Sequence, residues 1–203
     1  MPAQAIWNPN QLSIEKLKIT QFQQHLNQKF SLNISNYQQL HQFSINETEK
    51  FWQEMVVFCD VDFIQAATET VAYGKHMIDT DWFINGTLNY AQNILKYRSD
   101  KIAIEFENEQ GVISSISYEQ LYSKVAKLQF FLIQQGINKG DRVAGFLPNV
   151  IETIIAMLAT TSLGAVWTST SPDFGFEGVI DRFGQVEAKI LFITDGYFYN
   201  GKT

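Results

Sequence analysis

The sequence predicts an α/β protein with a helical N-terminal region, a β-hairpin, and then an incomplete doubly wound parallel sheet. Three observations support this class. Apolar residues recur at helical spacing in residues 1–60, two alternating segments flank residues 108–111, and short apolar strands alternate with helices after Gly140. The 203 residues are 45% hydrophobic, which is enough for one sizeable core or two small ones.

The N-terminal helices are predicted from apolar residues that return every three or four positions. Their apolar faces comprise Ile19, Phe22, Leu26 and Phe30, then Tyr37, Leu40 and Phe43, then Phe51, Met55 and Phe58. Ser44 and Glu47 have the spacing of a capping box, so the third helix is expected to begin there. Residues 71–93 look irregular, with Trp82 and Phe83 in a loop before a short helix near 88–97.

A β-hairpin followed by a long helix is predicted next. Residues 101–106 and 112–117 alternate like strands around a glycine-containing turn at 108–111. Ser117 and Gln120 form a capping box for the helix that follows. Its apolar face comprises Leu121, Val125, Leu128 and Leu132, and it is expected to stop at Gly136.

The last part of the chain reads as a βαβαβ unit. Strands are expected at 142–147, 165–168 and 189–193, with helices between them at 149–162 and 177–186, the first capped by Asn149 and Glu152 and stopped by Gly164. Such alternation predicts a parallel sheet with right-handed crossovers. Three strands leave an exposed hydrophobic edge, so the sequence is interpreted as an unfinished domain. The predicted domains are 1–98, helical, and 99–203, the start of the sheet domain.

Composition and isolated residues exclude several classes of function. The net charge of −6 comes without a basic stripe, so no nucleic-acid partner is expected. Polar residues interrupt the longest apolar segment, 151–167, and no signal peptide is visible, so a soluble, cytoplasmic protein without a membrane partner is expected. Cys59 is expected to be a core residue. No metal site is predicted, because no histidine has a second ligand at helical spacing.

One stretch carries more information than its secondary structure. Residues 139–149 read KGDRVAGFLPN and are followed by Glu152, by AMLA at 156–159 and by LGAVW at 163–167. Taken one at a time, these residues can be explained as a strand, a proline that ends it and a capped helix. Their order, however, resembles the first core region of the adenylate-forming enzymes, which include acyl-CoA synthetases, luciferases and nonribosomal peptide adenylation domains. No dinucleotide fingerprint, Walker loop or GxSxG motif competes with this resemblance.

Further segments resemble one branch of that superfamily, the acetoacetyl-CoA synthetases. WFINGTLNYAQN at 82–93, STSPDFG at 169–175 and GVIDRFGQ at 178–185 match its signatures, and residues 195–202 agree as well. Acetyl-CoA synthetases are similar but have a glycine-rich sequence where Ser171-Pro172-Asp173 stands here. This chain departs from the usual residues at Ile84, Gln92 and Ala188.

The resemblance implies chemistry that this chain does not contain by itself. Members of the family use ATP and Mg²⁺ to activate a carboxylate as an acyl-adenylate, which the CoA thiol then attacks, releasing AMP. In family order, the groups that hold the triphosphate, the metal and the ribose follow Lys202. No catalytic and no metal-binding residue is therefore expected here, and the chain alone is expected to be inactive.

The resemblance also implies candidate CoA contacts. Pro172, Asp173 and Phe174 align with a segment that lies against the CoA adenine in acetyl-CoA synthetases, and Lys202 aligns with a basic residue that meets a CoA phosphate. A ring beside adenine and a cation beside phosphate are physically reasonable. The alternative is that Asp173 and Gly175 shape a turn, Phe174 is core, and Lys202 has no role. For Arg182, a surface charge network is preferred.

Two hypotheses of different classes follow. The chain is either the N-terminal part of an acetoacetate–CoA ligase, with an acetyl- or propionyl-CoA synthetase as a related alternative, or a stand-alone binding module. In the second case, the exposed sheet edge would form a homodimer or bind a complementary fragment. The acyl substrate itself cannot be predicted from these residues.

Overall fold

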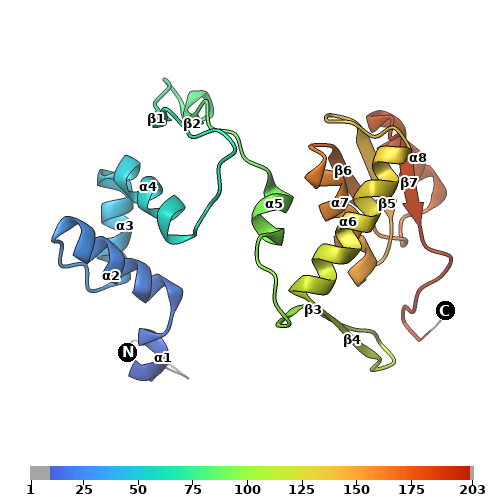
Figure 1. Ribbon diagram of the computed structural model, residues 1–203, viewed down its shortest axis with the longest axis horizontal. Coiled ribbons are helices and arrows are strands. Elements are labelled where there is room, and N and C mark those ends of the chain that lie inside the picture. Colours follow the sequence, from blue (N-terminus) through green and yellow to red (C-terminus); the bar gives the residue numbers. More distant parts are fainter. Residues whose placement is uncertain (1–9, 202–203) are drawn as a thin grey trace, which may run out of the picture. The chain divides into compact units, whose positions relative to one another are not determined.

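The structure is a computed structural model that describes residues 10–201. The chain, whose elements Figure 1 labels, divides after Leu88 into two compact units. Each unit has its own hydrophobic cluster. Within residues 10–201, no helix is both long and apolar enough to cross a membrane.

The first unit contains a helical part followed by a pair of short strands. Its elements are α1 (Gln11–Glu15), α2 (Lys18–Phe30), α3 (Tyr37–Asn46), α4 (Thr48–Phe58), β1 (Glu69–Ala72), a 3₁₀ turn (Met77–Asp79) and β2 (Asp81–Ile84). Its core consists of Phe22, Leu26 and Leu40, against which Phe30, Ile34, Phe43, Phe51, Met55 and Phe58 pack. The predicted apolar faces are confirmed except at Ile19 and Tyr37, the first residues of the first two faces, which are exposed.

Three sequence predictions in this unit are wrong. Ser44 does not open a helix: its hydroxyl donates to the His41 carbonyl inside α3, and α4 begins at Thr48 without a side-chain cap. Cys59 is exposed rather than core, because α4 ends one residue before it and the chain leaves the apolar face.

The third error concerns residues 71–93, which were expected to be irregular. β1 and β2 pair as antiparallel strands, with Val71 opposite Trp82. Four-residue strands are too short to show a convincing alternation, and their pairing depends on contacts elsewhere in the unit. Trp82 lies edge-to-face with Trp52 of α4, with ring centroids 5.7 Å apart, so tertiary packing supports the strand.

The second unit confirms the predicted α/β class. It contains α5 (Tyr90–Leu95), β3 (Ile102–Glu107), β4 (Ile113–Ser117), α6 (Tyr118–Gln134), β5 (Arg142–Phe146), α7 (Ile151–Ser162), β6 (Val166–Thr170), α8 (Phe176–Val186) and β7 (Ile190–Ile193). β3 and β4 form the antiparallel hairpin. β5 is the central strand of a parallel sheet, with β6 on one side and β7 on the other.

Local signals explain why these elements begin and end where they do. Ser117 and Gln120 form the predicted capping box of α6, and Gly136 follows that helix with φ of 77°. The predicted cap of α7 is wrong, because Val150 holds the N-cap position and Asn149 does not cap. A short turn replaces the cap: the Val150 N–H donates to the Pro148 carbonyl at 2.9 Å.

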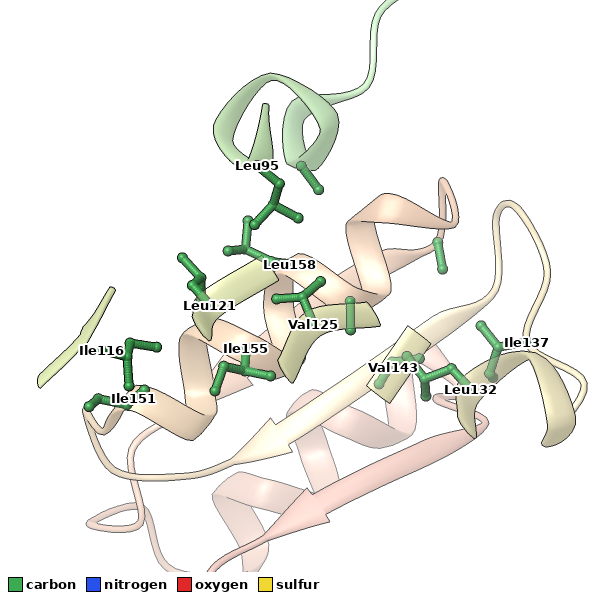
Figure 2. Close-up of a cluster of buried hydrophobic side chains, with 13 residues drawn as sticks. Leu95, Ile116, Leu121, Val125, Leu132, Ile137, Val143, Ile151, Ile155 and Leu158 are labelled. Carbon is green, nitrogen blue, oxygen red and sulfur yellow. The ribbon is translucent and has the colours of Figure 1, made fainter. Parts of the chain in front are cut away.

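The core of the second unit lies between α5, α6 and α7 and extends to the central strand β5. Figure 2 shows Leu95, Leu121 and Leu158 gathered from these three helices, with Val143 of β5 beneath them. Leu132 and Leu158 are among the largest fully buried side chains. This packing holds the helices and the central strand together and so fixes the ends of the strands, where the candidate site lies.

Candidate functional site

A hollow of about 860 Å³ lies at the carboxyl ends of the parallel strands. Its walls come from the end of the hairpin and from the loops after β5, β6 and β7, and comprise Phe106–Glu109, Leu147–Val150, Glu152, Ser171–Asp173 and Ile193–Tyr199. The chain passes from β5 to β6 on one side and then crosses to β7 on the other. Loops diverge at such a switch point, which is where open α/β sheets bind ligands.

Asp173 ties two of these loops together. The Ser171 hydroxyl donates to Oδ2 of Asp173 at 2.7 Å, and the Tyr197 hydroxyl donates to Oδ1 at 2.5 Å. The bond from Tyr197, followed by that from Ser171, lowers the pKa of the Asp173 carboxyl, and the same contact raises the pKa of Tyr197. The loop after β6 is therefore joined to the loop after β7.

Glu109 ties the hairpin turn to the same loop from the other side. Its Oε1 accepts the Asn200 N–H at 3.0 Å and its Oε2 accepts the Gly201 N–H at 3.1 Å. These two bonds, with that from Asn200 the larger cause, lower the pKa of the Glu109 carboxyl. Asn200 and Gly201 both have positive φ, at 51° and 72°.

Phe174 lies apart from the residues that line the hollow. The residue is 43% exposed, so the alternative that Phe174 is core is wrong. The Arg182 guanidinium carbon lies 4.2 Å from the ring centroid, a cation–π contact. Arg182 also donates to the Gly178 carbonyl, and Gln185 donates to Asp181. The second bond belongs to the expected surface network, whereas the contacts of Arg182 are with a carbonyl and a ring.

The predicted CoA contacts therefore fall into three groups. Pro172 and Asp173 line the hollow, Phe174 stands outside its lining, and Lys202 lies outside the described residues. Asp173 also shapes its turn, because its N–H donates to the Ser171 hydroxyl oxygen at 3.3 Å. Glu109 was not singled out from the sequence, and Tyr197 was matched to the family without a role.

The charged residues Asp141 and Arg142 of the KGDRV stretch lie at the opposite end of the sheet, where they have structural partners. Asp141 pairs with Lys189 at 2.7 Å, and the bonds from Lys189 and then the Asn138 N–H lower the pKa of Asp141. Arg142 donates to the carbonyls of Val186 and Glu187 and so caps the end of α8. These charged residues hold the framework and do not touch the hollow.

The second of the two glycines in residues 139–149, Gly145, also has a structural role. Gly145 is buried in β5, and a Cβ there would lie 2.6 Å from the Trp167 ring. Glycine thus lets the indole lie directly over the central strand. The last three residues of the stretch, Leu147, Pro148 and Asn149, reach the hollow.

Comparison with known families matches this architecture. The family model described as AMP-binding enzyme matches residues 91–202, which is more than half of the chain. The chain belongs to the AMP-binding enzyme family. A second model, for the acetyl-coenzyme A synthetase N-terminus, matches residues 37–94.

Individual relatives narrow the similarity to one branch. The chain is 37% identical to an acetoacetyl-coenzyme A synthetase of Rhizobium meliloti (strain 1021) over 97% of its length, and 38% identical to an acetoacetyl-CoA synthetase of Xenopus tropicalis over 100%. A solved acetoacetyl-CoA synthetase from Streptomyces lividans matches 98% of it with a TM-score of 0.90 and 36% identity. The predicted resemblance is confirmed. The chain spans about 30% of the length of these relatives and 31% of the solved chain.

Proposed function

We propose that this chain is the N-terminal part of an ATP-dependent acetoacetate–CoA ligase. The reaction would join acetoacetate and CoA to give acetoacetyl-CoA, with ATP cleaved to AMP and pyrophosphate and Mg²⁺ assisting. The observation that carries the proposal is the match to the Streptomyces lividans acetoacetyl-CoA synthetase over 98% of this chain, at 36% identity. In this proposal, residues 1–98 form the helical N-terminal region and 99–203 begin the AMP-binding domain, in a cytoplasmic enzyme.

The hollow suits the adenine end of CoA better than its phosphates. Its volume lies in the range of small-ligand sites, and Leu147, Pro148 and Pro172 offer apolar surface. Its described lining holds five carboxylates, from Glu107, Glu109, Glu152, Asp173 and Asp195, and no lysine or arginine. A phosphate placed there would meet like charge, so a cation is needed.

Lys202 is the proposed source of that cation, because the resemblance aligns it with a basic residue that meets a CoA phosphate. Pro172 and Asp173 would then contact the adenine end, with Phe174 at the outer margin. Asp173 would act mainly by holding the rim, since both its oxygens already accept hydrogen bonds. No catalytic role is proposed for these residues.

A pair of chimeras tests this function. In the first chimera, this chain replaces the matched 31% of the Streptomyces lividans enzyme. In the second chimera, this chain replaces the corresponding part of an acetyl-CoA synthetase. The first chimera should release pyrophosphate when given ATP, Mg²⁺, acetoacetate and CoA. The second should be much less active with acetate, and the 203-residue chain alone should release none.

The parental Streptomyces lividans enzyme is the positive control. Circular dichroism establishes that each chimera is folded before its activity is compared. A folded first chimera without acetoacetate-dependent turnover would contradict the proposal. Equal activity of the two chimeras would favour the acetyl- or propionyl-CoA synthetase alternative, and turnover by the chain alone would show that it holds a complete site.

Association through the sheet edge is the second candidate function. β6 and β7 are the outer strands of the described sheet, and Val166 and Leu191 on them are about half exposed. An edge of this kind can pair with a second copy of the chain. Light scattering would then give a dimer mass, and Leu191→Lys should reduce it to the monomer. A monomer at all concentrations would exclude this function.

A further inference from the structure

The loop after β7, residues 194–201, is held over the hollow by two carboxylates from distant parts of the unit. Tyr197 donates to Asp173, and the N–H groups of Asn200 and Gly201 donate to Glu109. Within the loop itself, the Thr194 hydroxyl donates to the Gly196 carbonyl and accepts the Gly196 N–H. The loop also supplies one wall of the hollow.

Glu109 is not needed to shape its own turn. Asn108 does that: its Oδ1 accepts the N–H groups of Gln110 and Val112, both at 3.0 Å, and its N–H donates to the Val112 carbonyl. Gly111 completes the turn with φ of 72°. The Glu109 carboxylate is therefore available for contacts across 91 and 92 residues of sequence, one on each oxygen.

We propose that Glu109 is a positioning residue that fixes the loop of residues 194–201 as a wall of the ligand hollow. It acts through the backbone N–H groups of Asn200 and Gly201. The identity of the ligand, CoA, rests on the proposed function. The anchoring of the loop rests on the two hydrogen bonds alone.

Glu109→Gln removes this anchor with little change of shape. An amide has a single acceptor oxygen, and its NH₂ group would face a backbone N–H donor, so at least one bond is lost. A charge-assisted bond also becomes a weaker neutral one. Glu105→Gln, on β3 of the same hairpin, is the control, because Glu105 is exposed and does not line the hollow.

Amide NMR of the 203-residue chain tests the anchor directly. In Glu109→Gln, the amide signals of residues 195–201 should shift and show greater fast motion, while those of the hairpin turn stay in place. In the wild type, the Gly201 amide should follow the ionisation of Glu109. Its transition should lie at a lower pH than that of an ordinary glutamate, because the hydrogen bonds from Asn200 and Gly201 lower the pKa of Glu109. Glu105→Gln should preserve both features. An unchanged loop in Glu109→Gln would overturn the proposal.

Titration of CoA into the same proteins separates this inference from the proposed function. Glu109→Gln should bind CoA roughly threefold to tenfold more weakly than the wild type, the effect of one lost hydrogen bond. Glu107→Gln also removes one negative charge from the lining but leaves the Glu109 anchor in place, so it should bind CoA more tightly than the wild type. The comparison separates the loss of the anchor from the loss of a charge. If the wild type does not bind CoA, the proposed CoA site fails and the NMR result alone decides the anchor. Equal affinity of wild type and Glu109→Gln would overturn the positioning role.

Discussion

Replacing Leu132 by alanine is expected to lower the free energy of unfolding by about 2–5 kcal/mol. Leu132 lies on α6 with none of its surface exposed. Figure 2 shows it beside Val143 and Ile137, at the point where the helix meets the central strand. The truncation removes buried methyl groups and leaves a cavity that the surrounding elements can fill only in part.

The neighbouring residue provides a matched control. Ile133 is on the same helix but is 49% exposed, so Ile133→Ala should change the stability by no more than about 0.5 kcal/mol. Urea unfolding followed by circular dichroism measures both variants. Equal losses in the two variants would show that α6 does not pack on the sheet through the face described here.

The second unit was predictable because its signals are local. Ser117 and Gln120 mark the start of α6 within four residues of sequence, and Gly136 and Gly164 mark helix ends through backbone conformations that favour glycine. Alternation of short apolar strands with helices then leaves few topologies. The parallel sheet followed from these rules, without knowledge of any long-range contact.

The errors at the two predicted caps arise because other hydrogen-bond partners replace the ones that the cap motif implies. Ser44 satisfies the spacing of a capping box, yet α3 continues through it. Asn149 satisfies the composition of a cap, yet the turn at Pro148 takes its place. Local propensity is a weak guide when neighbouring elements supply competing hydrogen bonds and packing.

The candidate site shows the same limit more sharply. Pro172 and Asp173 were found because their segment resembles a known signature. Tyr197 and Glu109 contact partners that lie 24, 91 and 92 residues away, and no periodicity or spacing encodes such pairs. The resemblance located the site, whereas only the fold shows which residues hold it together.

The KGDRVAGFLPN stretch illustrates how one motif serves two ends of a sheet. Its charged residues, Asp141 and Arg142, hold Lys189 and the end of α8 at the amino ends of the strands. Its last residues, Pro148 and Asn149, border the hollow at the carboxyl ends. The motif thus sets the framework and the rim of the site, and the chemistry must come from other groups.

His25→Phe is expected to destabilise the first unit by about 1–3 kcal/mol, because it leaves a buried carboxylate without its main partner. The Glu54 side chain is only 8% exposed, and its Oε2 lies 2.6 Å from Nε2 of His25. Lys29 is more distant, at 3.7 Å, and is 57% exposed. Phenylalanine preserves the ring packing against Phe22 and Phe58, so the loss reports the polar contact.

Glu54→Met tests whether the unpaired carboxylate causes the loss of stability in His25→Phe. A buried ion pair costs desolvation energy, so replacing both partners by apolar groups of similar size is often neutral or stabilising. The double variant with His25→Phe and Glu54→Met should therefore regain most of the lost stability in urea unfolding. Lys29→Met should cost less than about 1 kcal/mol, as expected for an exposed partner. If the double variant is no more stable than His25→Phe, lost packing rather than an unpaired charge determines the stability of this helical core.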